Sequence, residues 1–535
     1  MEIKRNIIYS LILVLGNYLF PLITFPYVSR VLGVTQIGVV NFVDSIVNYY
    51  IMFSMLGLSI LGIREIAKSK NNALEISRVF STLLALNFII TILLFVHNIL
   101  FVIYLSAIFI FPQLYTYRYL LYIGAVKLFF NVFLLEWLYR GLENFKYITI
   151  CSLLLRSIYV VSLFVLVKNA NDVLVYYMLT VSLVVFMAIV NTSYSTRHVK
   201  FCFKNVHNLR FYIKPYVELG IYLILTSMYT TFNVIYLGFV STQDEVGYYV
   251  TALKIYTIIL GAFTAFTNVM MPRMSALLSD RNSEDFQKLT RSSFYLFISL
   301  SFPIICYVIS MAPDIIYLIA GDGYEGAITP MRIIIVLILF VGLAQILAIQ
   351  VLIPLKKDKI VLKAAFVGAV IGIIFNVVLV NLFSSVGTAI TLCVSEISVT
   401  LLLLFYVIRN KVIQLPWIFF FKNILYSIVP YFLISICVKL LNYNFLINLF
   451  VVMLAYSVYF LFSQIGIVNN PVLLYIIKKN KYASILHVAD IYDTLSNNDT
   501  KSILIDLPEN ALYLFNRSGG MTPKNIITYF MKDYG

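Results

Sequence analysis

Residues 7–28 read IIYSLILVLGNYLFPLITFPYV, a run without any charged side chain. An α-helix needs about 20 apolar residues to cross the hydrocarbon core of a bilayer, so this run is long enough to span a membrane. A second apolar run, residues 37–62, follows almost directly. The first run is too long for the hydrophobic part of a signal peptide, and no cleavage pattern follows it. We therefore predict that both runs are membrane-spanning helices.

The same pattern continues along the chain. Of its 535 residues, 61% are apolar and 12% are charged, and the mean hydropathy is +0.93. Soluble domains average about 45–50% apolar and 25% charged residues, so this composition excludes an ordinary soluble enzyme, a disulfide-rich secreted domain and a disordered chain. We predict an all-α polytopic membrane bundle of about 14 spans. The predicted spans are residues 7–28, 37–62, 80–108, 119–139, 147–167, 173–195, 217–239, 247–271, 292–312, 331–353, 361–382, 387–408, 420–441 and 446–467.

The basic residues predict how the spans are oriented. The chain has 39 Lys and Arg against 24 Asp and Glu, a formal net charge of +15. Most of the cations fall in alternate connections between spans, such as residues 64–78, 197–214 and 273–291. Cytoplasmic loops are enriched in Lys and Arg, so these connections and both termini are predicted to lie in the cytoplasm. The net charge is then mainly a matter of topology, and it does not indicate a nucleic-acid partner.

A short internal similarity predicts the domain organisation. Leu32-Gly33 precedes Gly38, and six spans later Leu237-Gly238 precedes Gly247 in the same way. This favours two pseudo-symmetric six-helix lobes, residues 1–215 and 216–410, around a central cavity, as in many transporters. Residues 411–467 would add two extra spans, and the polar residues 468–535 would form a cytoplasmic tail. The alternative is a chance similarity between two glycine turns.

Charged side chains inside the spans are the candidates for function, because a charge in a membrane is costly and usually faces the bundle interior or a wet cavity. Lys127 and Glu136 are nine residues apart and would share one face of a continuous helix. We predict that a substrate cavity is lined by Lys127, Arg156, Lys254, Arg30 and Asp44. Candidates for coupling to H⁺ or Na⁺ are Asp44, Glu136 and Glu396.

The sign of these charges bears on the substrate. Lys127, Arg156 and Lys254 at least match the deep carboxylates in number, which favours an anionic substrate such as a phosphate. A drug exporter driven by cations would favour a cavity dominated by carboxylates. The alternative is that the charges form structural ion pairs between helices. We predict no metal site, because Cys and His show no ligand spacing, no cofactor beyond a coupling ion, and no enzymatic activity.

Four segments together resemble a known family. Residues 20–33, FPLITFPYVSRVLG, with residues 62–67, GIREIA, resemble the opening of the bacterial polysaccharide flippases. Residues 136–149, EWLYRGLENFKYIT, and Gly247-Tyr248-Tyr249 with Lys254 resemble later parts of the same proteins. These are the Wzx-like O-antigen and capsule transporters, the polysaccharide transporter family of the MOP (multidrug/oligosaccharidyl-lipid/polysaccharide) superfamily. The resemblance covers roughly residues 5–467.

The resemblance implies a flippase of the bacterial cytoplasmic membrane. By alternating access it would move an undecaprenyl-pyrophosphate-linked oligosaccharide from the inner to the outer leaflet, for O-antigen, capsule or exopolysaccharide assembly. Membrane lipids, a polysaccharide polymerase and other assembly proteins would be its partners. Lys254 stands where the related lipid II flippases carry a cavity arginine, which implies contact with pyrophosphate. The first span lacks their cavity arginines before Arg30, which argues against a peptidoglycan precursor as substrate.

Two other functions stay open at this point. One is a cation-coupled antiporter for drugs or small molecules in the same superfamily. The other, from a different class, is a membrane polymerase or ligase acting on lipid-linked glycans. Neutralising Lys254 and measuring the lipid-linked glycan that accumulates on the cytoplasmic side separates the flippase from both alternatives.

Overall fold

The computed structural model describes residues 2–69, 72–108, 112–201, 209–279, 283–441, 443–475 and 477, and their regular structure is entirely helical. From residue 478 onward, the predicted cytoplasmic tail lies outside the described residues. The helices of the first half of the chain are α1 (Glu2–Met55), α2 (Leu58–Lys68), α3 (Ala73–Ile108), α4 (Pro112–Thr116), α5 (Arg118–Asn131), α6 (Glu136–Gly141), α7 (Phe145–Leu166), α8 (Val173–Ser195), α9 (Leu209–Ser227) and α10 (Thr231–Val240).

The second half continues in the same way. Its α-helices are α11 (Gln243–Ser279), α12 (Ser283–Ser310), α13 (Ala312–Ala320), α14 (Ile328–Ile334), α15 (Leu337–Gln345), α16 (Asp358–Phe375), α17 (Asn381–Arg409), α18 (Trp417–Lys439) and α19 (Phe445–Phe462). Short 3₁₀ segments are η1 (Val132–Leu134), η2 (Ala170–Asp172) and η4 (Glu325–Ala327). Three π-helical segments follow longer helices, namely η5 (Ile346–Leu352), η6 (Asn376–Val380) and η7 (Ser463–Ile467).

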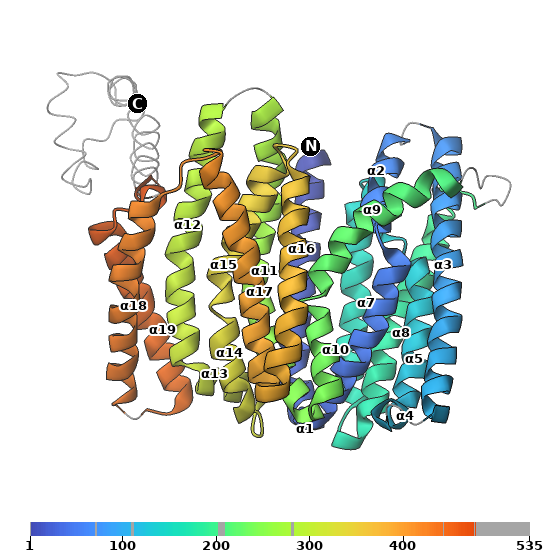
Figure 1. Ribbon diagram of the computed structural model, residues 1–535, viewed down its shortest axis with the longest axis horizontal. Coiled ribbons are helices and arrows are strands. Elements are labelled where there is room, and N and C mark those ends of the chain that lie inside the picture. The colour runs from blue at the N-terminus through green and yellow to red at the C-terminus, as the bar shows by residue number, and fades with distance from the viewer. Residues whose placement is uncertain are drawn as a thin grey trace, which may run out of the picture.

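The predicted spans all fall on these helices. Within the described residues, 10 helices are long and apolar enough to cross a membrane, or 12 when two bent pairs are each taken as one span. Two of the 10 are unusually long, Ile12–Lys68 with 57 residues and Asp358–Arg409 with 52. The first is broken at Gly33 (φ 77°) and the second at Ser384 (φ 46°), so each carries two predicted spans. In Figure 1, α1 begins at one end of the molecule and turns at the other, so that α2 lies level with the N-terminus.

The predicted span over residues 119–139 differs from the structure in one respect. The helix ends at Leu134, Leu135 adopts the left-handed conformation (φ 50°), and Glu136 begins a new helix, α6. Leu135, Trp137 and Leu138 are all buried, and their packing against α2 and α3 holds this break in place. The prediction that Lys127 and Glu136 share one face of a continuous helix is therefore wrong.

The two segments of the predicted repeat meet at the end of the bundle opposite the N-terminus. A Cβ added to Gly38 on α1 would lie 1.8 Å from the carbonyl oxygen of Gln243, and one added to Gly247 on α11 would lie 2.4 Å from that of Val34. Only glycine fits so close a backbone approach. Beside it, Thr35 donates a hydrogen bond to Asp244 at 2.5 Å. These contacts fix α1 against α11, the two helices that carry most of the candidate site.

Candidate functional site

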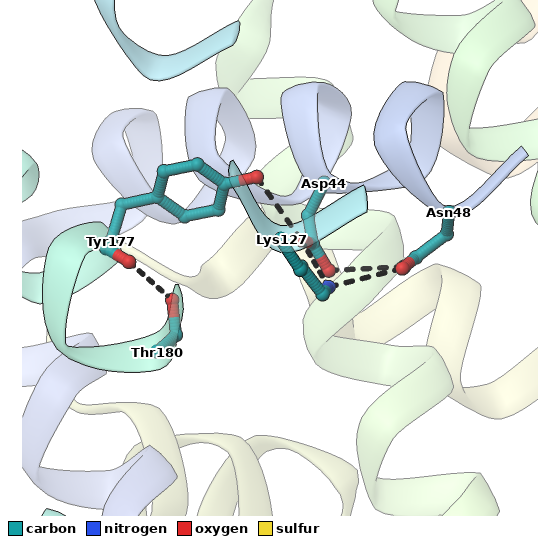
Figure 2. Close-up of polar contacts among 5 residues, drawn as sticks. All are labelled: Asp44, Asn48, Lys127, Tyr177 and Thr180. Carbon is teal, nitrogen blue, oxygen red and sulfur yellow. Dashed lines mark hydrogen bonds and ion pairs between the residues drawn. The ribbon is translucent and has the colours of Figure 1, made fainter. Parts of the chain in front are cut away.

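An ion pair between two helices is the centre of the candidate site. The Lys127 Nζ on α5 lies 2.6 Å from Oδ1 of Asp44, on the second half of α1 (Figure 2). The two side chains are 18% and 30% exposed, respectively. Both residues are predicted from the sequence to line a substrate cavity, with structural ion pairs between helices as the alternative. The structure shows the pair.

Neighbouring polar groups support both partners of the pair. Lys127 also donates to Oδ1 of Asn48 at 3.0 Å, and the Asn48 amide donates to Oδ2 of Asp44 at 3.0 Å. The Tyr177 hydroxyl on α8 donates to Oδ1 of Asp44 at 3.2 Å (Figure 2). Asp44 therefore accepts hydrogen bonds from three side chains, those of Lys127, Asn48 and Tyr177. Asn48 lies one helical turn after Asp44, which is why both reach the same ammonium group.

Glycine lets these three helices approach one another. A Cβ added to Gly124, one turn before Lys127 on α5, would lie 2.4 Å from a methyl group of Val47 and 2.9 Å from the hydroxyl of Tyr177. Val47 and Tyr177 are themselves almost fully buried. The ion pair is thus embedded in tight packing of α1, α5 and α8, and its geometry is fixed by the fold.

Arg156 of α7 contacts the first half of α1. Its Cζ lies 6.0 Å from the ring centroid of Phe20, within the range of a cation–π interaction. Its Nε is buried without a hydrogen-bond partner, and within the described part of the chain the guanidinium forms no ion pair. Glu136 is the carboxylate that acts on it electrostatically, and that carboxylate is bound to Arg140 at 3.1 Å.

Lys254 of α11 contacts the same half of α1 from another helix. Its Nζ lies 4.8 Å from the ring centroid of Phe25, which is buried. Among the described residues the Lys254 ammonium group has no hydrogen bond and no ion pair, although it lies within electrostatic range of Asp44. Asp44 already neutralises Lys127. Arg156 and Lys254, which contact two different rings on the first half of α1, are therefore two cations whose charge no paired carboxylate among the described residues balances.

The structure separates Arg30 from these residues. Its guanidinium donates to the carbonyl oxygen of Pro26 at 3.0 Å and to those of Leu318 and Tyr317 at 2.5 and 3.4 Å. Leu318 and Tyr317 belong to the last turn of α13, where the carbonyl end of the helix favours a cation. Arg30 thus ties the end of the first half of α1 to α13. None of these bonds joins Arg30 to the surroundings of Lys127, Arg156 or Lys254.

The other predicted carboxylates differ in their surroundings. Glu136 is the first residue of α6, 42% exposed, and paired with Arg140. Glu396 on α17 is partly buried, and the described residues offer its carboxylate neither a hydrogen bond nor an ion pair. It lies within electrostatic range of two buried tyrosines, Tyr229 and Tyr256. No group of three or more His, Cys, Asp or Glu side chains in the described ranges is placed to hold a metal ion.

Four residues of the site were not identified from the sequence. Asn48 and Tyr177 are uncharged, and nothing in their spacing separates them from the many other polar residues of the spans. Phe20 and Phe25 are part of the quoted motif, but a phenylalanine in a membrane span is ordinarily a packing residue. One feature of the sequence could have pointed to both rings. A proline directly follows each of Phe20 and Phe25, and the two prolines mark a distorted stretch of α1.

Two family models match the chain. The model of the family described as "Polysaccharide biosynthesis protein" matches residues 3–278, and the model of the family described as "MatE" matches residues 219–378. The first match includes Asp44, Lys127, Arg156 and Lys254. The second begins in α9 and reaches into η6, so the two matches overlap from the end of α9 through α11.

Two bacterial proteins similar to the chain carry the name "Putative O-antigen transporter". The one from Escherichia coli (strain K12) is 26% identical over 417 residues, which are 77% of this chain and 98% of that protein. The one from Shigella dysenteriae is 24% identical over 410 residues, 75% of this chain and 99% of that protein.

Solved structures confirm the predicted fold. The lipid II flippase MurJ in an inward closed conformation superimposes with a TM-score of 0.70 at 16% identity, covering 86% of this chain and 98% of that one. An inward-facing multidrug resistance MATE family transporter of the MOP superfamily superimposes with a TM-score of 0.56 at 14% identity, covering 76% of this chain and 94% of that one. The all-helical polytopic membrane bundle is thus a fold shared with both proteins.

Proposed function

The chain belongs to the polysaccharide biosynthesis protein family of the MOP superfamily, a family of transporters rather than enzymes, and on this premise we propose that it flips lipid-linked oligosaccharides. Its substrate would be an undecaprenyl-pyrophosphate-linked repeat unit, moved from the inner to the outer leaflet of the bacterial cytoplasmic membrane by alternating access. The product would serve O-antigen, capsule or exopolysaccharide assembly. The names of the two bacterial relatives support this class of substrate.

One observation carries the proposal. Arg156 and Lys254 come from different helices, and each contacts an aromatic ring on the first half of α1. Within the described residues neither has a paired carboxylate. Two unbalanced cations in a membrane-spanning bundle are costly unless an anion joins them, and a pyrophosphate carries the matching charge. In this proposal Arg156 and Lys254 bind the pyrophosphate, while Lys127 is held by Asp44 and shapes the site.

The remaining predicted residues take other roles in the proposal. Arg30 closes the bundle at the end away from the N-terminus, through its bonds to the last turn of α13. Glu396 would be the carboxylate that takes up a coupling ion, since Asp44 and Glu136 are both paired with a basic side chain. The lobes at residues 1–215 and 216–410 would rock against each other to move the site between leaflets. The basic connections and both termini would face the cytoplasm.

The test replaces the two unpaired cations. The variants Arg156→Gln and Lys254→Gln are expressed in the native host after deletion of the host's own gene for this protein. Lys422→Gln is expressed in the same way as a matched control. Lys422 is an exposed cation on α18, which lies at the far edge of the molecule from α7 in Figure 1. Loss of a charged contact costs about 1.5–3 kcal/mol, so each site variant is expected to lower flipping roughly tenfold or more.

Flipping is measured in spheroplasts as the fraction of lipid-linked glycan that an impermeant reagent can modify from outside. If the protein is a flippase, the site variants leave unpolymerised lipid-linked glycan in the inner leaflet, where the reagent does not reach it. Lys422→Gln then behaves as wild type. Normal export with Arg156 and Lys254 both neutralised would overturn the proposal. Export of drugs without any change in glycan would indicate the antiporter, and glycan polymerised or ligated by the purified protein would indicate an enzyme.

A further inference from the structure

A second site is suggested by an apolar groove on the other side of α5. The groove has a volume of about 690 Å³ and lies between α3, η1, the end of α8 and the start of α9. Its walls are mainly aromatic and aliphatic, including Phe80, Leu84, Phe88, Phe133, Val199 and Leu209. The size falls within the range of pockets that bury a small ligand. Phe88 is 37% exposed, so the groove opens to the surroundings of the bundle.

Three basic residues are close neighbours, in the sequence, of residues that line this groove. Arg78 lies two residues before Phe80 on α3, Lys200 directly follows Val199, and Arg210 directly follows Leu209. The backbone N–H of Lys200 donates to the Ser77 hydroxyl at 3.2 Å, which places Lys200 beside the start of α3. All three side chains are exposed, and in the part of the chain that the structure describes none of them forms an ion pair.

The acidic residues near this end do not cancel that charge. Glu65 binds Arg64 and Lys68, both at 3.0 Å, so it is already balanced by two cations. Glu75, on the first turn of α3, is a further carboxylate among the described residues, against three cations from three segments of the chain. This end of the bundle is the basic one, where α2 ends and α9 begins (Figure 1). By the distribution of Lys and Arg it faces the cytoplasmic leaflet.

The groove is separate from the site on α1. In Figure 1, α3 stands at the edge of the molecule, whereas α11, which carries Lys254, lies near its middle. None of the residues that line the groove belongs to the site of Asp44, Lys127, Arg156 and Lys254. A lipid whose phosphate sits on Arg156 and Lys254 is therefore a different molecule from one that occupies the groove.

We propose that this groove binds one hydrocarbon chain of an anionic phospholipid from the cytoplasmic leaflet, with its phosphate held by Arg78, Lys200 and Arg210. The apolar walls match the chain, and the three cations match the headgroup. Anionic lipids are attracted to basic residues at a membrane surface by a free energy that corresponds to roughly fivefold in affinity per residue. A zwitterionic lipid with the same chains gains little from the cations, so the site selects by headgroup.

The chain carries its own reporter of the groove. Trp137 is 2% exposed and stacks on Phe80, with ring centroids 5.8 Å apart and an angle of 29° between the planes. The chain has two tryptophans, and the other, Trp417, is 43% exposed at the start of α18. Lipids with brominated chains quench tryptophan fluorescence at short range. Trp137 therefore reports on lipid in the groove, and Trp417 reports on the surrounding bilayer.

The experiment uses the full chain with Trp417→Phe, reconstituted in phosphatidylcholine vesicles. A minor fraction of the lipid is replaced by brominated phosphatidylglycerol, or by brominated phosphatidylcholine at the same mole fraction. Stronger quenching of Trp137 by the phosphatidylglycerol is expected. A second protein carries Trp137→Phe instead, so that its fluorescence comes from Trp417. Quenching of Trp417 is expected to be similar for both headgroups. Equal quenching of Trp137 by the two lipids would overturn the proposal.

Two further variants locate the site. Arg78→Gln/Lys200→Gln/Arg210→Gln is expected to abolish the preference for phosphatidylglycerol. Lys356→Gln/Lys357→Gln/Lys359→Gln, which removes the same charge from exposed positions at the start of α16, is expected to retain it. Ala85→Phe, which fills the groove from within, is expected to weaken quenching by both lipids. An unchanged preference in the first variant, with an unchanged Trp137 emission spectrum, also overturns the proposal. None of these readouts depends on flipping.

Discussion

Gly38 on α1 lies so close to Gly247 on α11 that a Cβ added to Gly38 would stand 3.1 Å from the backbone nitrogen of Gly247. The same Cβ would stand 1.8 Å from the carbonyl oxygen of Gln243, so this is a contact between backbones. The two glycines occupy matching positions in the short internal similarity of the sequence. The contact therefore joins the two segments at which the predicted repeat units begin their second helices.

Gly38→Ala and Gly247→Ala are predicted to destabilise the protein by about 1–3 kcal/mol each, because the overlap is with backbone and cannot be relieved by turning a side chain. The measurement is thermal unfolding in detergent. Gly466→Ala is the control, since no atom lies within 4 Å of a Cβ at that position. A melting temperature that falls as much for Gly466→Ala as for the other two would contradict the prediction.

The ion pair between Asp44 and Lys127 is predicted to be structural. Asp44→Asn leaves the Lys127 ammonium group without its charged partner, and Lys127→Gln leaves the carboxylate without its strongest donor. Loss of a hydrogen bond to a charged group costs about 1.5–3 kcal/mol, so each single variant should lose stability of that order. The double variant Asp44→Asn/Lys127→Gln should lose less than the sum of the two.

A double-mutant cycle on the free energy of unfolding measures this coupling, which is expected to be about 1–2 kcal/mol. Tyr177→Phe serves as a matched comparison, because it removes one donor to Asp44 and leaves the ion pair in place. If the single losses are simply additive, the pair does not stabilise the fold, and Lys127 returns to the set of residues available to a substrate.

Arg30 is predicted to hold the end of α1 against α13. Ser29, next to it, is fully buried, and its carbonyl oxygen accepts a hydrogen bond from the Tyr324 hydroxyl at 3.1 Å. Arg30→Gln removes the bonds to the carbonyl groups of Pro26 and Leu318, so a cysteine at position 29 should react several-fold faster with an impermeant maleimide. Arg332→Gln is the control, because Arg332 also donates to a backbone carbonyl, that of Ile309, at 3.2 Å. Labelling that is faster in both variants would indicate a general loosening.

The sequence was sufficient to predict where the spans lie, because membrane burial requires long apolar runs and all of these runs fall on helices, some of them bent or broken. It also marked residues 32–38 and 237–247 as similar segments six spans apart, but the contact between their glycines was visible only in the structure. The break after Leu134 was not predictable in the same way. It depends on burial of Leu135 and Trp137 against α2 and α3, and the local residues are as apolar as those of an unbroken helix.

The charged residues of the candidate site could be selected from the sequence, but the ion pair between two of them could not. The charges of Asp44, Lys127, Arg156 and Lys254 stand out in apolar segments, so they were easy to select. Which of them neutralise each other depends on tertiary contacts, since Asp44 and Lys127 are 83 residues apart in the chain. The contacts of Arg156 and Lys254 with the rings of Phe20 and Phe25 were not predictable for a related reason. A span rich in phenylalanine does not reveal which ring contacts a cation from another helix.

The last prediction concerns ion coupling. Asp44 and Glu136 are each paired with a basic side chain, whereas the Glu396 carboxylate has no such partner among the described residues. A carboxylate already bound to a cation has little capacity for a second one, so coupling is expected to depend on Glu396. Glu396→Gln should remove most of the stimulation of flipping by an imposed proton or sodium gradient, measured in vesicles, and leave the rate without a gradient unchanged. Glu136→Gln, which removes a carboxylate that is 42% exposed, is the matched control and should retain the stimulation. The opposite pattern would assign coupling to Glu136, and loss of the basal rate in Glu396→Gln would mean that this carboxylate serves the substrate or the fold.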